Sequence, residues 1–417
     1  MLKNDLHEIL NSAVKAVLPE NAVKDALNNP AFTSRKGKGK IVLASIGKAA
    51  WRMAKAASDI LGPGVTGAVV TKYEHSMGEI KGLEIFEAGH PVPDENTIKG
   101  TEALLKHVRN LCADDTVLFL VSGGGSALFE MPAEGVTLDD MQDVTSQLLA
   151  CGADIVEINT IRKHLSSVKG GRFAEMCAPA HVFMVVLSDV LGDRLDSIAS
   201  GPAAPDMSTS DEALAVVKKY NLRVKPELLK ILSRETPKKL DNVTATITGS
   251  VTALCQAVSV LAEKKGYTPL VLTTTLTCEA REAGAFLAAV AREVKASGRP
   301  VKAPCAIIAG GETVVHLTGK GLGGRNQELA LSAATGIDGL DGIAVASLGS
   351  DGTDGPTDAA GGIVDGTTAS ILREKGISIP EILRNNDAYN ALKQADALLM
   401  TGPTGTNVND VSVVLVK

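Results

Sequence analysis

The chain lacks three kinds of run that would place a protein in a membrane, in a secretory route or on a nucleic acid. No stretch approaches about eighteen consecutive apolar residues, the length that a membrane-spanning helix needs. The N-terminal segment 1–7 carries charge where a signal peptide needs an apolar run. No basic run extends beyond residues 35–40, and the formal net charge is −6. We therefore expect a cytoplasmic protein with no membrane and no nucleic-acid partner.

Spacings typical of disulfide frameworks and metal sites are missing too. The six cysteines lie far apart with no C-x-x-C pair, and several stand in apolar or helical stretches. This pattern predicts buried free thiols rather than disulfides or a metal site. The seven histidines form no H-x-x-H or H-E-x-x-H pattern. Only His90, in the loop 89–94, stands out, and we expect it to be structural.

Several well-known catalytic signatures are also absent. The phosphate loop G-x-x-x-x-G-K-[ST] does not occur, because Gly47-Lys48 is followed by Ala49 and has no upstream glycine. No strand carries G-x-G-x-x-G with an acid about twenty residues later, so the dinucleotide fingerprint fails. The G-x-S-x-G elbow of serine hydrolases fails at residues 124–128, where the second glycine is missing. A nucleotide site here would be of another kind.

What the chain does have is an alternation of apolar strands and helices. Its 417 residues predict two or three domains, since a single core rarely exceeds ~250–300 residues. The contents of 45% hydrophobic and 22% charged residues are ordinary for a globular protein. The apolar strands predict an α/β architecture with parallel sheets. The charged stretch 235–239 is the expected boundary, which gives domains 1–238 and 239–417.

The stretch 117–129 organises the first half of the chain. Five apolar residues, 117–121, read as a strand buried on both faces. Ser122-Gly123-Gly124-Gly125-Ser126 follows, and a helical run begins after it. Glycine lets backbone N–H groups approach a bulky anion, and the helix start adds its free N–H groups and its dipole. The segment predicts a phosphate cradle, and the alternative is a tight strand-to-helix turn.

Charged residues gather just past predicted strands, where α/β sheets bind ligands. Lys48 follows the strand 41–46, and Arg325 projects from the glycine-rich segment 321–328; both suit a phosphate or carboxylate. Lys48 could also be a solvated residue at a helix start. Acids also follow strand ends: Asp189, Glu312, Asp351 and Asp354. They could hold Mg²⁺ or accept a hydroxyl proton, and each could equally cap a helix or turn. Arg162, Lys169 and Arg172 would share a helix face or end if that helix runs far enough.

A series of motifs runs along almost the whole chain. They are Ile46-Gly47-Lys48-Ala49-Ala50-Trp51, Gly89-His90-Pro91-Val92-Pro93-Asp94, Ser122–Ser126, Asn159–Ser166, Leu187–Val190 with Ser200-Gly201-Pro202, Gly310–Thr313, Gly323–Glu328, Gly349–Gly355 and Thr404–Asp410. Taken together and in this order, these motifs resemble the glycerate 2-kinase family, whose C-terminal part is called the multi-organism fragment rich in leucine.

The resemblance implies ATP-dependent phosphorylation of D-glycerate at its 2-hydroxyl, with Mg²⁺. It also implies two three-layer α/β domains, the first Rossmann-like with a mainly parallel sheet, and an active site in the interdomain cleft. The family's catalytic lysine and arginine fall on Lys48 and Arg325. We expect Asp189 to be catalytic as well, and to bind metal together with Asp351. The expected nucleotide-binding residues are Ser122, Gly123, Gly124, Gly125, Ser126, Glu312 and Asn407.

Two rival functions remain open. Some relatives are labelled hydroxypyruvate reductases, so an NAD(P)H-dependent reductase is the enzyme alternative, although the dinucleotide fingerprint is missing. A non-catalytic nucleotide or anion sensor is the other alternative, although mere binding needs fewer charged groups than this chain places at strand ends. We expect a monomer or a small homo-oligomer.

Overall fold

The computed structural model describes residues 2–417, which fold into two compact units. One unit is Pro19–Thr248, and the other joins the N-terminal segment up to Leu18 with Gly249–Lys417. This division differs from the expected boundary after residue 238 in two respects. The strand that follows that position, Val243–Gly249, belongs to the first sheet. The first helix, Leu2–Ala16, packs its apolar face on the helix Val251–Lys264, far along the sequence.

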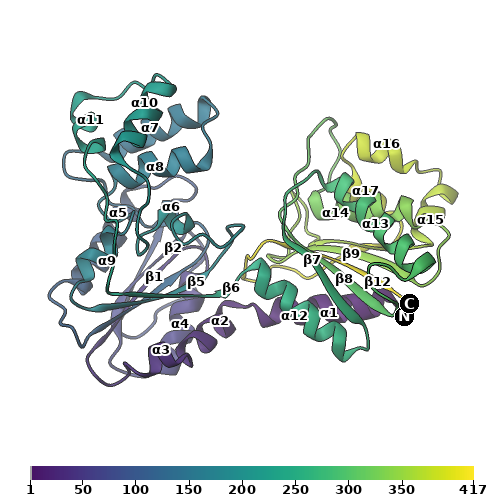
Figure 1. Ribbon diagram of the computed structural model, residues 1–417, viewed down its shortest axis with the longest axis horizontal. Helices are drawn as coiled ribbons and strands as arrows, with labels where there is room; N and C mark the ends of the chain where they lie inside the picture. Colours follow the sequence, from purple (N-terminus) through teal and green to yellow (C-terminus); the bar gives the residue numbers. More distant parts are fainter. Residues whose placement is uncertain (1) are drawn as a thin grey trace. The chain divides into compact units, whose positions relative to one another are not determined.

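The Pro19–Thr248 unit is built on a six-stranded sheet (Figure 1). Its strands are β1 Ile41–Ile46, β2 Thr66–Lys72, β3 Leu83–Ala88, β4 Thr116–Val121, β5 His181–Leu187 and β6 Val243–Gly249. They lie in the order β3-β2-β1-β4-β5-β6, and β3 to β5 pair in parallel. All six residues of β4 are buried, as its unbroken apolar sequence predicted. The order is that of a Rossmann-like doubly wound sheet, so the prediction for this unit is confirmed.

Helices cover this sheet and form a separate cluster beside it. The helices of the unit are α2 Pro19–Leu27, α3 Pro30–Thr33, α4 Ala50–Leu61, α5 Glu95–Val108, α6 Gly125–Leu128, α7 Leu138–Ala150, α8 Ile155–Leu165, α9 Arg172–Cys177, α10 Ser210–Lys219 and α11 Pro226–Leu232, with a short 3₁₀ turn at Ile198–Ser200. Helices α7, α8, α10 and α11 share an apolar core of their own, apart from the core under the sheet. We call them the helical cap; they gather at one end of the unit (Figure 1).

The second unit contains another six-stranded sheet, but a mixed one. Its strands are β7 Thr268–Leu276, β8 Cys305–Gly311, β9 Ile343–Gly349, β10 Gly361–Asp365, β11 Leu398–Leu399 and β12 Asp410–Val416, in the order β11-β10-β9-β12-β8-β7. Only β7 and β8 are shown paired in parallel, and the expectation of a parallel sheet is wrong here. The reason is two strands that the sequence analysis did not recognise: β12 lies antiparallel between β8 and β9, and β10 is antiparallel to β9.

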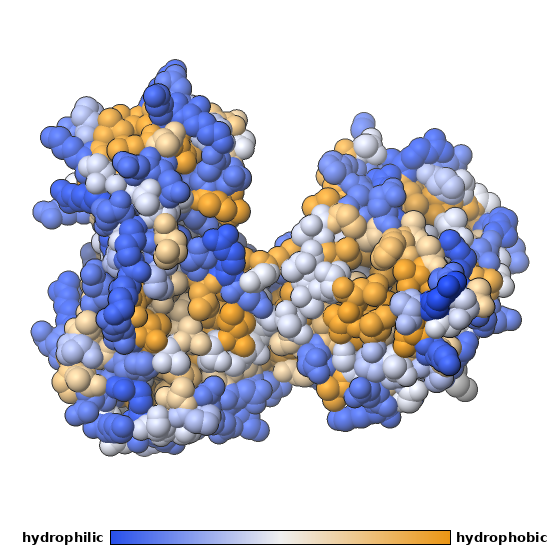
Figure 2. Space-filling view, in the orientation of Figure 1, coloured by the Kyte–Doolittle hydropathy of each residue, from blue (hydrophilic) through white to orange (hydrophobic). Residues whose placement is uncertain are grey.

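Helices lie on both faces of the mixed sheet, so this unit also has three layers (Figure 1). They are α1 Leu2–Ala16 and α12 Val251–Lys264 on one face, and α13 Ala280–Ser297, α14 Arg325–Gly336, α15 Thr368–Glu374, α16 Ile379–Arg384 and α17 Ala388–Gln394 on the other. Strand β7 is an edge strand, and Val271 and Leu272 of β7 and Phe286 of α13 are exposed. Apolar residues also appear on the surface of this unit in Figure 2.

Two predictions about composition can be compared with the structure. All six cysteines are free, but only Cys177, Cys255 and Cys305 are buried, so the expected burial is wrong for the other three. Among residues 2–417, no helix is long and apolar enough to cross a membrane.

Candidate active site

The glycine loop Ser122–Ser126 lies where the doubly wound sheet reverses direction. Strands β1 and β4 are neighbours, with Ile46 opposite Val121, so the segments that follow them emerge side by side. Ser122 joins these segments: its hydroxyl donates to the carbonyl of Ile46 (3.1 Å) and accepts from the amide of Ala49 (3.1 Å). The amide of Lys48 donates to the carbonyl of Gly123 (2.8 Å). The hydroxyl of Ser122 therefore holds the loop in place.

The loop offers donors that the protein itself does not use. Within residues 2–417, the amides of Gly123 and Gly124 donate no hydrogen bond. Successive unpaired N–H groups in such a turn form an anion-binding concavity. The helix expected to reinforce it is only the single turn α6, so that part of the prediction is wrong, because one turn has almost no dipole.

Three functional groups lie close to the glycines. A Cβ added at Gly124, whose φ is +81°, would lie 2.8 Å from the ring of His90 and 3.3 Å from Cε of Lys48. A Cβ at Gly123 would lie 2.2 Å from a carboxylate oxygen of Asp189. The structure thus brings the predicted residues Lys48 and Asp189 to the loop, together with His90. Side chains larger than hydrogen would push these groups away.

The charges around the loop perturb one another. Burial raises the pKa of the Asp189 carboxyl, and the positive charge of Lys48 opposes this rise. Burial also lowers the pKa of His90, and the charges of Lys48 and Lys72 lower it further. In the part of the chain that the structure describes, the ammonium of Lys48 makes no hydrogen bond and no ion pair. Lys48 is therefore a cation available to an anionic ligand.

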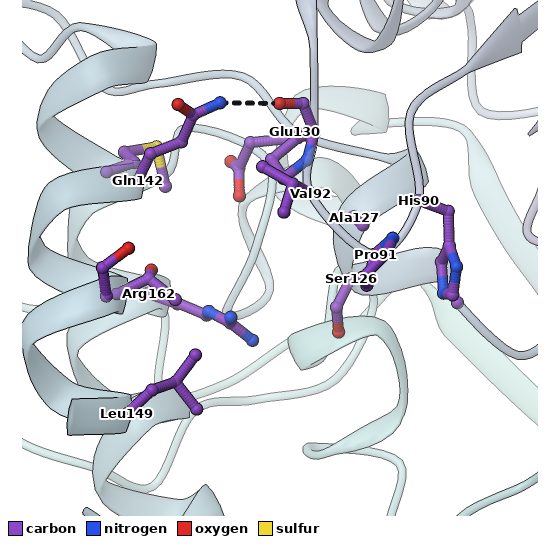
Figure 3. A pocket seen from close by; sticks show the side chains of 14 residues that line it. His90, Pro91, Val92, Ser126, Ala127, Glu130, Gln142, Leu149 and Arg162 are labelled. Carbon is purple, nitrogen blue, oxygen red and sulfur yellow. Dashed lines mark hydrogen bonds between the residues drawn. The ribbon is translucent and has the colours of Figure 1, made fainter.

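Two pockets flank the glycine loop within this unit. One has a volume of about 330 Å³, and its lining includes the whole loop, Asp189, Arg194 and Asn159. The other has a volume of about 290 Å³ and lies between the loop, the segment His90–Pro93 and helix α7 (Figure 3). Gly124, Ser126 and Arg162 line both pockets. We call the first the phosphate-side pocket and the second the apolar pocket.

Of the three cations expected to share a helix face, only Arg162 lines these pockets. Helix α8 ends at Leu165, so Lys169 and Arg172 lie beyond it and the expected sharing is wrong. Lys169 is fully buried and donates to the carbonyls of Ser126 and Phe129, which supports the loop from behind. Arg172 donates to the carbonyls at the end of α8.

A second group of predicted residues lies in the other unit, at one end of the mixed sheet. Asp410 begins β12 and is paired in register with both Gly311 of β8 and Gly349 of β9. Arg325, the first residue of α14, donates from Nε and Nη2 to the two carboxylate oxygens of Asp410 at 2.5 and 3.0 Å. Its Nη1 lies 3.2 Å from Oε1 of Glu312.

The contacts with Asp410 and Glu312 keep the guanidinium of Arg325 charged. Burial works against the charged guanidinium, but the hydrogen bonds to Asp410 together with the negative charges of Asp410, Glu312 and Asp354 raise the pKa of Arg325. A guanidinium has five N–H groups, and three point at Asp410 and Glu312, which leaves two for a ligand. Arg325 is thus a fixed cation that is still able to bind an anion.

The other residues predicted for this unit, Asp354, Asp351 and Asn407, accept hydrogen bonds from backbone amides. Asp354 is buried and accepts from the amides of Asn326 (3.2 Å) and Gln327 (2.8 Å), so it caps α14, which was the structural alternative for it. Burial raises the pKa of Asp354 to about 7. Asp351 accepts from the amide of Thr353 (3.0 Å) in a turn, and Asn407 accepts from the amide of Asn409 (3.3 Å).

The sequence analysis assigned no site role to Arg162, His90 or Asp410. The sequence did contain a signal for the helix that carries Arg162. Asp154 and Glu157 have the three-residue spacing of a capping box, and they start α8. The apolar run 411–416 could have revealed β12 and hence Asp410. His90 stood out in its loop but was expected to be structural, because only the folded loop brings its ring to Gly124.

Known proteins resemble this chain over its whole length. The profile described as a domain of unknown function (DUF4147) matches residues 5–233, and that of the MOFRL family matches residues 305–410. A Thermotoga maritima protein named D-glycerate 2-kinase is 56% identical, over 100% of this chain and 98% of its own length. An Agrobacterium vitis protein named putative hydroxypyruvate reductase is 40% identical, over 91% of this chain and 100% of its own.

A solved structure extends the likeness to the fold. The crystal structure of glycerate kinase from Thermotoga maritima matches with a TM-score of 0.95 at 56% identity, and the match covers 100% of this chain and 99% of that one. Identity of this level over the full length, with both profiles in place, shows the family. The chain belongs to the glycerate 2-kinase family.

Proposed function

We propose that this protein transfers the γ-phosphoryl group of ATP to the 2-hydroxyl of D-glycerate, which yields 2-phospho-D-glycerate and ADP. The observation that carries the proposal is the 56% identity over the whole chain to a D-glycerate 2-kinase. The unpaired amides of Gly123 and Gly124 and the nearby ammonium of Lys48 support it, because a nucleotide triphosphate needs such donors.

In the transfer, the oxygen of the 2-hydroxyl bonds to the γ-phosphorus while the bond to the β,γ-bridging oxygen breaks. The acceptor's proton leaves to a base, and ADP takes the electron pair of the broken bond. We assign the proton to Asp189, because burial raises its pKa and so makes this carboxylate a better base at neutral pH. Charge on the transferring group is balanced by Lys48 and Arg325, since positioned charge contributes most in this reaction class.

Enzymes that transfer a phosphoryl group from ATP use Mg²⁺. Among residues 2–417, no three histidine, cysteine or acidic side chains cluster as a metal site. Mg²⁺ in nucleotide enzymes is often held by one or two carboxylates together with phosphates and waters. Asp189, next to the glycine loop, fits that role as an alternative to acting as the base, because Mg²⁺ bound to this carboxylate would lower its pKa. Asp351 is the other carboxylate we propose for the ion. When bound, the ion would neutralise phosphate charge.

Further assignments follow the same proposal. Glu312 and Asn407 would contact the nucleotide, as would the backbone of Ser122–Ser126. Within the loop, the amides of Gly123 and Gly124 are the unpaired donors, whereas Ser122 holds the loop: its amide donates to the carbonyl of Ile46 (3.0 Å) and its hydroxyl is engaged too. We also propose that the protein works in the cytoplasm as a monomer or a small homo-oligomer, which gel filtration with light scattering would test.

The alternative function is NAD(P)H-dependent reduction of hydroxypyruvate. It is supported by one observation: a relative that is 40% identical is named a putative hydroxypyruvate reductase. A product-resolved assay separates the two. Purified protein is incubated with D-glycerate, ATP and Mg²⁺, and phosphorus NMR distinguishes 2-phosphoglycerate from 3-phosphoglycerate. In parallel, NADH or NADPH with hydroxypyruvate is followed by absorbance.

We expect phosphate at the 2-position and no oxidation of the reduced nicotinamide. Phosphate at the 3-position would keep the phosphotransfer and refute its regiochemistry. Oxidation of NADH or NADPH without phosphorylation would overturn the kinase proposal. Tight binding of ATP without turnover of either substrate would favour a nucleotide sensor.

A further inference from the structure

The apolar pocket beside the glycine loop has no role in the proposed phosphotransfer so far. Its walls are mostly carbon: Pro91, Val92 and Pro93 on one side, Ala127 at the base, and Met141 and Leu149 of α7 on the other. Figure 3 shows Leu149 and Val92 on different sides of the cavity. The amide of Gln142 donates to the carbonyl of Pro93 (2.8 Å), which ties the loop to α7 and fixes the separation of the two walls.

Arg162 connects this pocket to the phosphate-side pocket. Its guanidinium points into the cavity (Figure 3). Within residues 2–417 it makes no hydrogen bond or ion pair, and the buried carboxylate of Glu130 and the buried ammonium of Lys169 both act on it electrostatically. Burial lowers the pKa of Arg162, and Glu130 opposes this effect. Because Glu130 is itself paired with Lys169 (3.4 Å), the partly buried guanidinium keeps N–H groups without a hydrogen-bond partner, which an anionic ligand would satisfy.

The two pockets therefore differ in chemistry but share Gly124, Ser126 and Arg162. A ligand that fills both must be apolar and flat at one end and anionic at the other, with its anionic part passing Arg162 and the glycine amides. D-Glycerate suits the apolar pocket less well than an apolar group does, because its carboxylate and two hydroxyls need several polar partners and most of the pocket's surface is apolar. A nucleotide has the required division between base and phosphates.

We propose that the apolar pocket binds the nucleoside of the ATP co-substrate, between the Pro91–Pro93 loop and helix α7. Arg162 binds the phosphate nearest the ribose, and the chain of phosphates continues over Gly123 and Gly124 towards Lys48 and Asp189. The proposal rests on the proposed phosphotransfer from ATP. Volumes of about 290 and 330 Å³ lie at the lower end of the ~300–1,000 Å³ usual for small-molecule sites, and one nucleotide would use both.

Leu149→Glu is the sharpest test, because Leu149 is 62% exposed and its replacement should fold. It places a negative charge where the base would lie. We expect at least ~10-fold weaker ADP binding by calorimetry and a similar rise in KM for ATP. Affinity for inorganic tripolyphosphate and KM for D-glycerate should stay within about twofold of the wild-type values. Arg162→Gln should weaken the binding of both ADP and tripolyphosphate.

The matched control is Met207→Glu, which puts the same charge on a side chain of this unit that is 75% exposed and lines neither pocket. It should leave ADP binding unchanged. If Leu149→Glu binds ADP as the wild type does, or raises only KM for D-glycerate, the nucleoside assignment is overturned. Equal weakening by Met207→Glu would overturn it as well, because the effect would then be general electrostatics.

These results are distinct from failure of the proposed function. If the wild type phosphorylates D-glycerate while Leu149→Glu is unaffected, the function stands and the pocket assignment falls. If the wild type transfers no phosphate but binds ADP, and Leu149→Glu weakens that binding, the pocket assignment stands and the function falls. A wild type that binds neither ADP nor ATP overturns both.

Discussion

Replacing Arg325 with alanine should nearly abolish turnover, and the structure indicates how to separate that effect from lost stability. The guanidinium makes a bidentate contact with Asp410, which is 8% exposed, and also pairs with Glu312. If Arg325 stabilises the transferring phosphoryl group, its loss costs ~2.7–4 kcal/mol of transition-state binding, which lowers kcat by ~10²–10³-fold. Arg325→Ala also strands the carboxylate of Asp410 in a buried position, which costs ~1–3 kcal/mol of folding stability.

A double variant separates the two effects. Adding Asp410→Asn to Arg325→Ala removes the stranded charge, so stability measured by urea unfolding should largely return. The activity should stay low, because the guanidinium is still missing. Arg281→Ala is the matched control: Arg281 lies in the same unit and pairs with Glu328, which is 2% exposed. That variant should lose stability and, once folded, keep its kcat.

The assay is steady-state kinetics on protein shown to be folded by circular dichroism, with both substrates varied. A near-wild-type kcat with only a raised KM in Arg325→Ala would refute the reasoning, because it would make Arg325 a ground-state binding residue. Recovery of kcat in the double variant would refute it too, since the loss would then come from the stranded carboxylate.

Three further predictions concern groups around the two sites. Lys48→Met should lower kcat by ~10²-fold or more, and it should raise the pKa of His90 measured by NMR, because one of the charges that lower it is gone while burial remains. Gly123→Ala should reduce activity, because the new Cβ would meet a carboxylate oxygen of Asp189 at 2.2 Å and displace that side chain. Asp354→Asn should flatten the dependence of unfolding free energy on pH between about 4 and 7.

The sign of the last effect follows from proton counting. In the native state burial raises the pKa of Asp354 to about 7, so between pH 4 and 7 the native carboxyl keeps a proton that the unfolded chain has lost. Stability therefore falls by up to ~1.4 kcal/mol per pH unit as pH rises through this window. An Asp354→Asn slope equal to that of the wild type would contradict the shift. For Lys48→Met, an unchanged His90 titration would contradict the proximity, and a fully active Gly123→Ala would show that Asp189 is free to move.

Local patterns predicted those parts of the site that depend on one strand and the loop after it. The apolar run 117–121, the glycines after it and the position of Lys48 after 41–46 required only strand recognition and the rule that ligands bind at carboxyl ends. Asp354 shows the limit of such patterns. The sequence pattern of an acid after a strand end is the same whether the acid faces a ligand or caps a helix. In this structure Asp354 caps α14.

Long-range pairing decided what the local patterns could not. Asp410 becomes the partner of Arg325 only because β12 lies antiparallel between β8 and β9, and nothing near residue 410 specifies that register. Similarly, α1 packs on α12 through an apolar face that any neighbouring helix could have covered. A single boundary, such as the one expected after residue 238, cannot describe a unit that contains both ends of the chain.

The glycines of the candidate site have a second purpose besides access for phosphate. A Cβ at Gly47 would lie 2.3 Å from the hydroxyl of Ser122, so its absence permits the hydrogen bonds that join the ends of β1 and β4. At Gly123 the missing Cβ makes room for Asp189, and at Gly124 it makes room for His90. The same positions that free the backbone amides for an anion thus also admit the side chains that would act on it. Substitution of these glycines should therefore harm positioning of the acid as well as binding of the nucleotide, and these two effects should be separable by comparing kcat with the affinity for ADP.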